Sequence, residues 1–117
     1  MAKSTVTLRE LAGVAIVDFD GAIMIGESRI LFRKTIDELV GTGRTRILLN
    51  FRRVTTVDSA GVGELVATYA LMRAKDVKVK LLSPSPTVYN LLTLTKLSNL
   101  FEVYSDEELA LHSFDEP

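Results

Sequence analysis

One nine-residue stretch, Thr55–Gly63, constrains the fold of this chain more than any other part of the sequence. A short apolar segment, Ile47–Leu49, precedes it, and apolar residues at the spacing of one helix face follow it. That predicted buried face comprises Val62, Leu65, Val66, Tyr69 and Ala70. The stretch is therefore predicted to be a strand-to-helix turn, which presents backbone N–H groups and the positive end of the helix dipole.

The residues of this turn fit a helix start, with one oddity. Asp58 and Ser59 are both residue types that favour the N-cap position. Gly61 and Gly63, in contrast, each cost about 1 kcal/mol in a helix relative to alanine. Two glycines in a first turn indicate that a partner or a neighbouring strand approaches the backbone closely. They do not form a dinucleotide-binding fingerprint, because the third glycine at the required offset is missing.

The rest of the chain reads as alternating strands and helices. The first two strands are expected to form a hairpin, with Asp20-Gly21 ending the second. The predicted elements, in order, are strands at Val6–Leu8 and Val14–Phe19, a helix from about Ser28 to Val40, a strand at Arg46–Phe51, a helix ending near Ala74, a strand at Val77–Leu82, a helix capped by Ser85, a strand at Leu100–Tyr104 and a helix anchored by Leu109 and Leu111.

This order predicts an α/β fold: a four- to five-stranded mixed sheet with about four helices packed mainly on one face. The apolar run Ile47–Leu49 is typical of a central strand, and the last short strand should lie at an edge. The strand-helix-strand order around Thr55–Gly63 predicts two parallel strands. At 117 residues the chain is expected to be a single domain, 1–117, with frayed termini at 1–4 and 113–117.

Composition excludes several classes of function. A net charge of −1 gives no electrostatic footprint for nucleic acid. No apolar run approaches the roughly 20 residues of a membrane span, and the polar start is unlike a signal peptide, so a cytoplasmic location is expected. The chain has no cysteine, and His112 is its one histidine, which argues against a zinc site and a Ser-His-acid triad. We therefore expect no catalytic residues, no metal and no cofactor.

Two segments resemble a known family. The string from Leu49-Asn50-Phe51 through Val57-Asp58-Ser59-Ala60-Gly61-Val62-Gly63 is similar to the signature of the STAS domain, which sulfate transporters and anti-sigma factor antagonists share. The end of the chain, Leu97–Ala110, resembles the final strand and helix of that family. The resemblance covers nearly the whole chain without a transmembrane part, which favours the anti-sigma factor antagonists.

The resemblance implies a protein-interaction switch. In the family, the serine after the aspartate is phosphorylated by a kinase that is also an anti-sigma factor, and the unphosphorylated form binds that kinase and frees a sigma factor. A serine phosphatase resets the switch. By motif match, Ser59 is the phosphoacceptor. The predicted partner-binding residues are Asp58, Ser59, Ala60, Gly61, Val62, Gly63 and Glu64.

Other interpretations stay open. Asp58 and Ser59 are also explained as ordinary helix caps, and Glu64 as a solvated first-turn residue. Arg52 and Arg53 fit either a phosphate or acidic partner, or simple solvation at a strand end. The chain departs from the family pattern at Ala60, where some members have a second serine, and at Lys96, where many have glycine. The alternative function is a STAS scaffold subunit of a signalling or membrane lipid-transport complex that is not phosphorylated.

Overall fold

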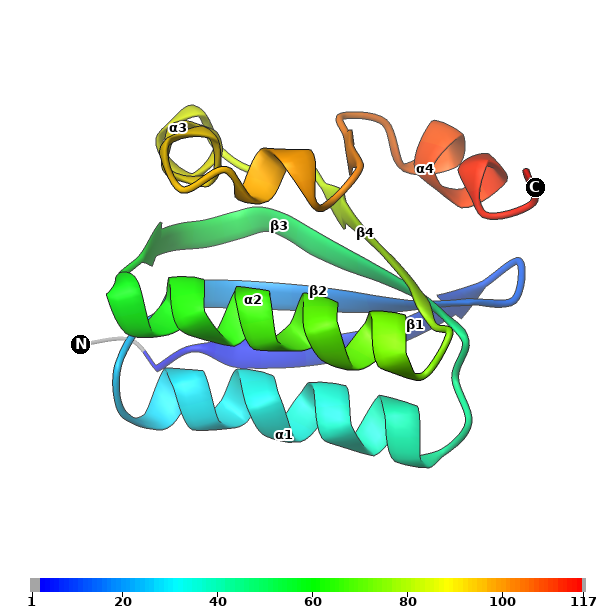
Figure 1. Ribbon diagram of the computed structural model, residues 1–117, viewed down its shortest axis with the longest axis horizontal. Coiled ribbons are helices and arrows are strands. Elements are labelled where there is room, and N and C mark those ends of the chain that lie inside the picture. The colour runs from blue at the N-terminus through cyan, green and yellow to red at the C-terminus, as the bar shows by residue number, and fades with distance from the viewer. Residues whose placement is uncertain (1–2, 117) are drawn as a thin grey trace.

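The computed structural model describes residues 3–116 and consists of one sheet with helices on both sides (Figure 1). The elements, in chain order, are β1 (Thr5–Leu11), β2 (Val14–Ile23), α1 (Glu27–Gly41), β3 (Arg46–Val57), α2 (Ser59–Ala74), β4 (Lys78–Leu82), α3 (Pro86–Leu94), the 3₁₀ helix η1 (Leu97–Asn99), β5 (Val103–Tyr104) and α4 (Glu107–Ser113).

The sheet has five strands in the order β1-β2-β3-β4-β5. Strands β1 and β2 are antiparallel, whereas β2 to β5 pair in parallel. The predictions of a mixed sheet, of parallel strands on either side of the helix after the signature stretch, and of a short last strand at the edge are confirmed. Parallel β2 and β3 both lead into helices, so α1 and α2 start at the same end of the sheet (Figure 1).

The predicted hairpin between the first two strands is present, and its turn has two residues. Leu11 pairs with Val14, and the loop residues Ala12 and Gly13 have φ angles of 52° and 76°. Positive φ at both loop positions is the geometry of a type I′ turn, whose twist matches that of the flanking strands. Its outer strand is wetter than the alternating pattern predicts, because Leu8 is exposed at this edge of the sheet.

Strands β2 and β3 are both longer than the sequence predicts. β2 continues through Gly21, which adopts a φ of +113° beside register shifts in the pairing with β3. The pairing of Gly21 with Val54 and of Ile23 with Val57 carries both strands on to the start of α2. The stretch around Thr55 is therefore strand, and the turn is reduced to Asp58.

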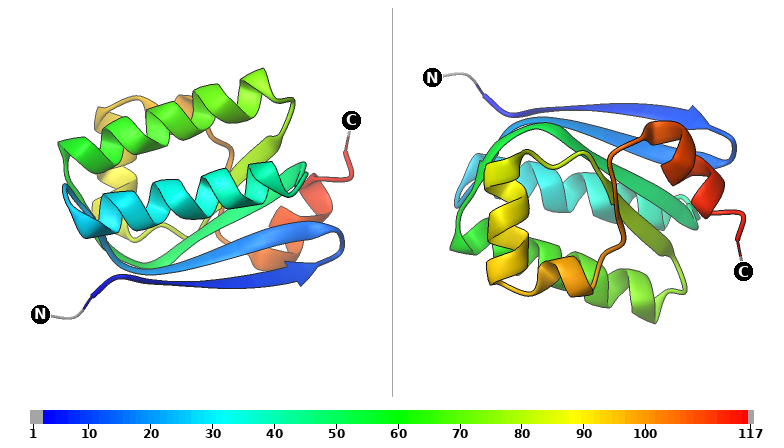
Figure 2. Two further views of the ribbon diagram at one scale, coloured as in Figure 1. Left: turned by 90° about the horizontal axis from the view of Figure 1, so that it is seen from below. Right: turned by 90° about the horizontal axis from the view of Figure 1, so that it is seen from above.

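The two faces of the sheet carry separate apolar clusters. Helices α1 and α2 lie side by side on one face, and α4 lies on the other (Figure 2). The larger cluster contains Phe19 and Phe51 from the sheet, Phe32 from α1 and Leu65 from α2, and α3 adds Leu92. Because three of the four helices contribute to this cluster, the prediction of helices mainly on one face is confirmed.

The smaller cluster fixes the C-terminal helix. Phe114 is fully buried with Ile16 and Leu48, which contradicts the expectation of a frayed segment from residue 113 onward. Leu109, expected to anchor the helix, is instead exposed, because α4 turns Ala110 toward the sheet. Residues 1, 2 and 117 of the expected frayed ends lie outside the described residues.

Two basic side chains hold α4 against the sheet by polar contacts. The Lys80 Nζ, buried in β4, donates to the Ser113 carbonyl oxygen (3.0 Å) and hydroxyl (2.8 Å) at the end of α4. At the start of α4, the Arg9 guanidinium bridges Glu107 (2.6 Å) and Asp18. This guanidinium, with the Asn50 amide, holds the pKa of the Asp18 carboxyl below its usual range.

Candidate functional site

The candidate site is the junction of β3 and α2, and Asp58 organises it. Asp58 is the N-cap of α2, and its Oδ1 accepts a hydrogen bond from the Gly61 N–H (2.9 Å). Its Oδ2 accepts from the Ile25 N–H (3.0 Å) in the loop between β2 and α1. One carboxylate therefore ties together two segments that are 33 residues apart in the sequence.

These hydrogen bonds favour the ionised form of Asp58. The N–H groups of Ile25 and Gly61 hold the pKa of the Asp58 carboxyl below its usual range. Both carboxylate oxygens have intramolecular partners, so Asp58 positions the site and is not simply a free surface charge. The expectation that Asp58 caps a helix is confirmed in geometry, and the cap additionally holds the β2–α1 loop in place.

Ser59 follows the cap and is the first residue of α2. It is exposed, and its hydroxyl makes no hydrogen bond to any other group of residues 3–116. The capping role belongs to Asp58, which leaves the Ser59 hydroxyl without a structural task. An exposed hydroxyl of this kind is accessible to a modifying enzyme.

Gly61 and Gly63 in the first turns of α2 have different surroundings, and packing requires a glycine at Gly61 alone of the two. A Cβ on Gly61 would lie 2.6 Å from Val57 Cγ1 and closer still to the Ile23 carbonyl oxygen. Close approach by a neighbouring strand thus accounts for Gly61. A Cβ on Gly63 would have no neighbour within 4 Å, so packing among residues 3–116 does not require that glycine.

Glu64 is not the solvated first-turn residue that the sequence suggests, because only 6% of it is exposed. Its carboxylate lies between two arginines of α1: Arg29 Nη1 is 2.9 Å from Oε1, and Arg33 Nε is 3.3 Å from Oε2. Glu64 joins α2 to α1, and it has little surface with which to touch a partner directly. No periodic pattern on one helix identifies this contact, because the arginines come from another helix.

The exposed face of α2 has no charge along most of its length. Ser59, Gly63, Val66 and Ala70 recur at steps of four, three and four residues, and all four are exposed. We call these four residues the α2 crest. The sequence predicts Leu65, Val66 and Ala70 in the buried face; Leu65 is fully buried as predicted, but Val66 is 45% exposed and Ala70 is exposed as well. An exposed apolar helix face is typical of a protein-interaction surface.

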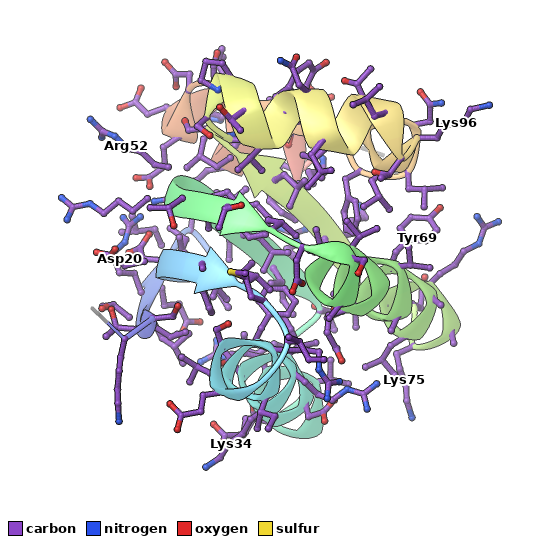
Figure 3. The ribbon with its side chains drawn as sticks, turned by 90° about the vertical axis from the view of Figure 1, so that its left-hand side faces the viewer. Asp20, Lys34, Arg52, Tyr69, Lys75 and Lys96 are labelled. Carbon is purple, nitrogen blue, oxygen red and sulfur yellow. The ribbon has the colours of Figure 1, made fainter. Side chains whose placement is uncertain are left out.

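The β2–α1 loop adds apolar side chains that the sequence did not identify as part of the site. Ile25, which is 77% exposed, and the exposed Met24 belong to the loop whose backbone Asp58 binds. The sequence left these residues unassigned between strand and helix. Arg52 and Asp20 point away from α1 and α2 in Figure 3 and line a shallow polar pocket of about 320 Å³ on the opposite face of the sheet.

Within residues 3–116, no cluster of three or more potential metal ligands is found. None of the helices in the same residues has the length and apolar character needed to cross a membrane.

A family model for the STAS domain matches residues 5–110 of the chain. The chain belongs to the STAS domain family. In this STAS domain the signature stretch forms the end of β3, the N-cap Asp58 and the start of α2 at Ser59. Lys96, at the position where the resemblance leads us to expect glycine, has a φ of +62°, so the turn before η1 contains a left-handed residue.

Three solved structures show the same fold. A proposed anti-sigma factor antagonist from Thermotoga maritima has a TM-score of 0.87 and 24% identity, with 95% of each chain covered. An anti-sigma factor antagonist from Mycobacterium paratuberculosis has a TM-score of 0.83 and 20% identity, covering 97% of this chain and 96% of that one. The phosphorylated form of the Bacillus cell fate determinant SpoIIAA has a TM-score of 0.72 and 23% identity, covering 94% and 99%. The comparison with curated proteins found no match.

Proposed function

We propose that this STAS domain is an anti-sigma factor antagonist whose partner binding is controlled by phosphorylation of Ser59. In the unphosphorylated form it binds an anti-sigma factor that is also a serine kinase, and this binding releases a sigma factor. The observation that carries the proposal is the exposed, unbonded Ser59 hydroxyl at the start of an uncharged crest. Residues Asp58 to Gly63, the rest of the crest (Val66 and Ala70) and the adjacent Met24 and Ile25 form the proposed binding surface.

The chemistry of the switch is a phosphoryl transfer to Ser59. The kinase moves the γ-phosphoryl group of ATP to the Ser59 Oγ, the hydroxyl proton is lost, and ADP leaves. The phosphatase adds water to the phosphoserine, which releases inorganic phosphate and restores the hydroxyl. The STAS domain is substrate and ligand in these steps, so we place it among regulators and not among enzymes.

Phosphorylation should block binding by local electrostatics without unfolding the domain. A phosphate carries about −1.5 to −2 charges at pH 7. A partner that packs on the crest must remove water from Gly63 and Val66, and it would have to desolvate the phosphate at the same time. Asp58, directly beside it, is ionised and adds a charge of the same sign. Every 1.4 kcal/mol of this penalty weakens the complex about tenfold.

The test compares four forms of the protein in binding to the cognate anti-sigma factor kinase. Wild type and Ser59→Ala should bind with similar affinity, whereas Ser59→Asp and the phosphoprotein should bind at least about tenfold more weakly, which corresponds to about 1.4 kcal/mol. Circular dichroism should be unchanged in all four. The kinase should modify wild type and leave Ser59→Ala unmodified.

The opposite results separate this proposal from its alternative. A phosphoprotein that binds as tightly as the unmodified protein would end the switch hypothesis. A domain that binds its partners but is modified by no kinase would instead support the unphosphorylated scaffold subunit. Val66→Asp is the matched variant for the surface, because it introduces a charge on the crest without touching Ser59. It should weaken binding even when the kinase cannot act.

A further inference from the structure

The buried carboxylate of Glu64 is paired with two cations, not one. Arg29 approaches one carboxylate oxygen at 2.9 Å and Arg33 the other at 3.3 Å, which leaves the three-residue cluster with one surplus positive charge. Glu64 is 6% exposed, whereas the two arginine side chains are 38% and 57% exposed. The carboxylate is thus fixed in the interior, and the surplus charge lies at the surface between α1 and α2.

This cluster lies beside the first turn of α2. Glu64 follows Ser59 by five residues, which is about 7.5 Å along the helix axis. The same five residues turn the helix by about 140°, so Glu64 faces α1 while Ser59 lies on the crest, and the Arg29 guanidinium has to reach around the first turn of α2 to bind a group on Ser59. Figure 3 looks onto the end of the molecule where both helices begin.

Arg29 is also joined to the loop that Asp58 holds. The Arg29 N–H donates to the Met24 carbonyl oxygen (3.1 Å), and the next residue, Ile25, donates to Asp58 Oδ2 (3.0 Å). The backbone of Arg29 is therefore linked through two residues and two hydrogen bonds to the residue preceding Ser59. Among residues 3–116, this is the arginine tied both to the cap of α2 and to a side chain of α2.

The guanidinium of Arg29 has donors to spare. Of its five N–H groups, one on Nη1 is used for Glu64, and the others donate to no group within residues 3–116. A guanidinium is a planar fork whose two edges can serve two acceptors, and phosphate oxygens are acceptors that fit it well. Arg29 can therefore keep Glu64 through Nη1 and donate to a second anion through the remaining N–H groups.

We propose that Arg29 binds the phosphoryl group on Ser59 while it stays paired with Glu64, so that the phosphorylated form has an ionic bridge from α2 through Arg29 to the phosphate. This inference rests on the proposed phosphorylation of Ser59. Glu64 is then a positioning residue, which holds the guanidinium where the phosphate will be. The partner surface is changed twice by one modification: a charge is added to the crest, and the N–H groups of Arg29 that do not bind Glu64 are occupied by the phosphate.

Arg33 is the natural control within the cluster. It pairs with the same carboxylate and is more exposed than Arg29, but it comes four residues later in α1. Four residues correspond to about 6 Å along the helix axis, away from the end at which α2 begins. If only the positive charge mattered, the two arginines would lower the second pKa of the phosphate to a similar extent. If Arg29 contacts the phosphate directly, Arg29 should have the larger effect.

The charged groups that surround the phosphate come from two helices and their caps. Asp58 precedes Ser59 and is ionised, and Glu27 is an exposed acid in the first turn of α1. Both raise the second pKa of a phosphoserine, whereas Arg29 lowers it, as Arg33 does from farther away. The pKa of the phosphate therefore reports which of these groups is in contact with it.

The experiment uses the full chain with phosphoserine installed at position 59 during translation, so that no kinase is needed. A ³¹P NMR titration gives the second pKa of the phosphate, which is ordinarily about 6. Relative to wild type, Arg29→Gln should raise this pKa by about 0.5 to 1 unit, and Arg33→Gln by less than about 0.3. Arg29→Lys, which keeps the charge, should restore most of the lowering.

Equal shifts in the two glutamine variants, or no shift in Arg29→Gln, would overturn the proposal. A readout on the unmutated chain covers the case in which Arg29→Gln fails to fold. In wild-type phosphoprotein, the guanidinium ¹⁵N resonances of Arg29 should move with the phosphate titration, and those of Arg33 should not. Because the phosphate is installed directly, this result does not depend on whether a kinase partner binds, and failure of the switch itself would be seen separately in the affinity measurements.

Discussion

The pair Gly61 and Gly63 offers a sharp test of the structure at the candidate site. Both are helical glycines two residues apart in α2, and both become alanine in the test. In an open helix the exchange should stabilise by about 1 kcal/mol, because alanine has the higher helix propensity. The structure predicts that this gain is obtained at Gly63, where a Cβ has no neighbour within 4 Å, and not at Gly61.

At Gly61 the added methyl group meets atoms that have little freedom to move. One is Val57 Cγ1, 2.6 Å away, and the other is the Ile23 carbonyl oxygen, which is backbone. That oxygen also accepts the Asp58 N–H at 3.3 Å, so displacing it disturbs the cap. Overpacking a well-packed site costs about 1–3 kcal/mol, and a backbone obstacle indicates the upper end of that range. After the propensity gain of about 1 kcal/mol, Gly61→Ala should lose about 2 kcal/mol.

Urea unfolding followed by far-UV circular dichroism measures both variants against wild type. We expect the free energies of unfolding of the two variants to differ by about 3 kcal/mol, Gly63→Ala being the more stable. For a chain of this size the difference corresponds to roughly 12 °C in Tm, at about 4 °C per kcal/mol. Equal m values would show that the unfolding transitions are comparable. If Gly61→Ala proved as stable as Gly63→Ala, the close approach of β2 to α2 would be refuted, and with it the geometry of the site.

Two further measurements test other parts of the same region. Leu65→Ala should lower the free energy of unfolding by about 2–5 kcal/mol in denaturant melts, because Leu65 is fully buried. Val66 is 45% exposed, so Val66→Ala should change the free energy of unfolding by no more than about 0.5 kcal/mol. Similar losses in both variants would mean that the orientation of α2 is wrong. The stability that Asp58 contributes should be complete above its unfolded pKa of about 3.9 and should fall as the pH drops through the lower folded value, since the N–H groups of Ile25 and Gly61 depress the folded pKa. Urea midpoints of wild type and Asp58→Asn between pH 7 and pH 2.5 should therefore converge at the acid end, and parallel curves would contradict the cap geometry.

The sequence predicts the order of elements and the cap well, because both depend on local signals. Ser85 caps α3 and Pro86 follows it as expected, and Asp58 caps α2. The lengths of β2 and β3 were underestimated, because the strands continue through Gly21 by pairing with each other across a register shift. A glycine next to an aspartate looks like a turn signal, and only the partner strand shows that the chain goes on.

Glu64 was misjudged for a related reason. A glutamate in the first turns of a helix is ordinarily solvated, and its interaction with the helix dipole is a sufficient local explanation. Its burial depends on Arg29 and Arg33, which lie 35 and 31 residues earlier in the sequence. The same is true of the Ile25 contact with Asp58, which joins residues 33 apart. Contacts of this range leave no periodic trace in either segment.

The error over Val66 has a different origin, which bears on function. Helix α2 carries apolar or small residues nearly all round, so the spacing of its apolar residues does not define which face is buried. A helix of this composition is ordinarily enclosed on all sides, yet Gly63, Val66 and Ala70 are exposed. A helix face that a partner covers carries apolar or small residues and no charge. Its sequence therefore resembles that of a face buried in the protein core. We therefore expect periodicity to misplace a face of this kind for the same physical reason that makes the face suitable for binding a partner.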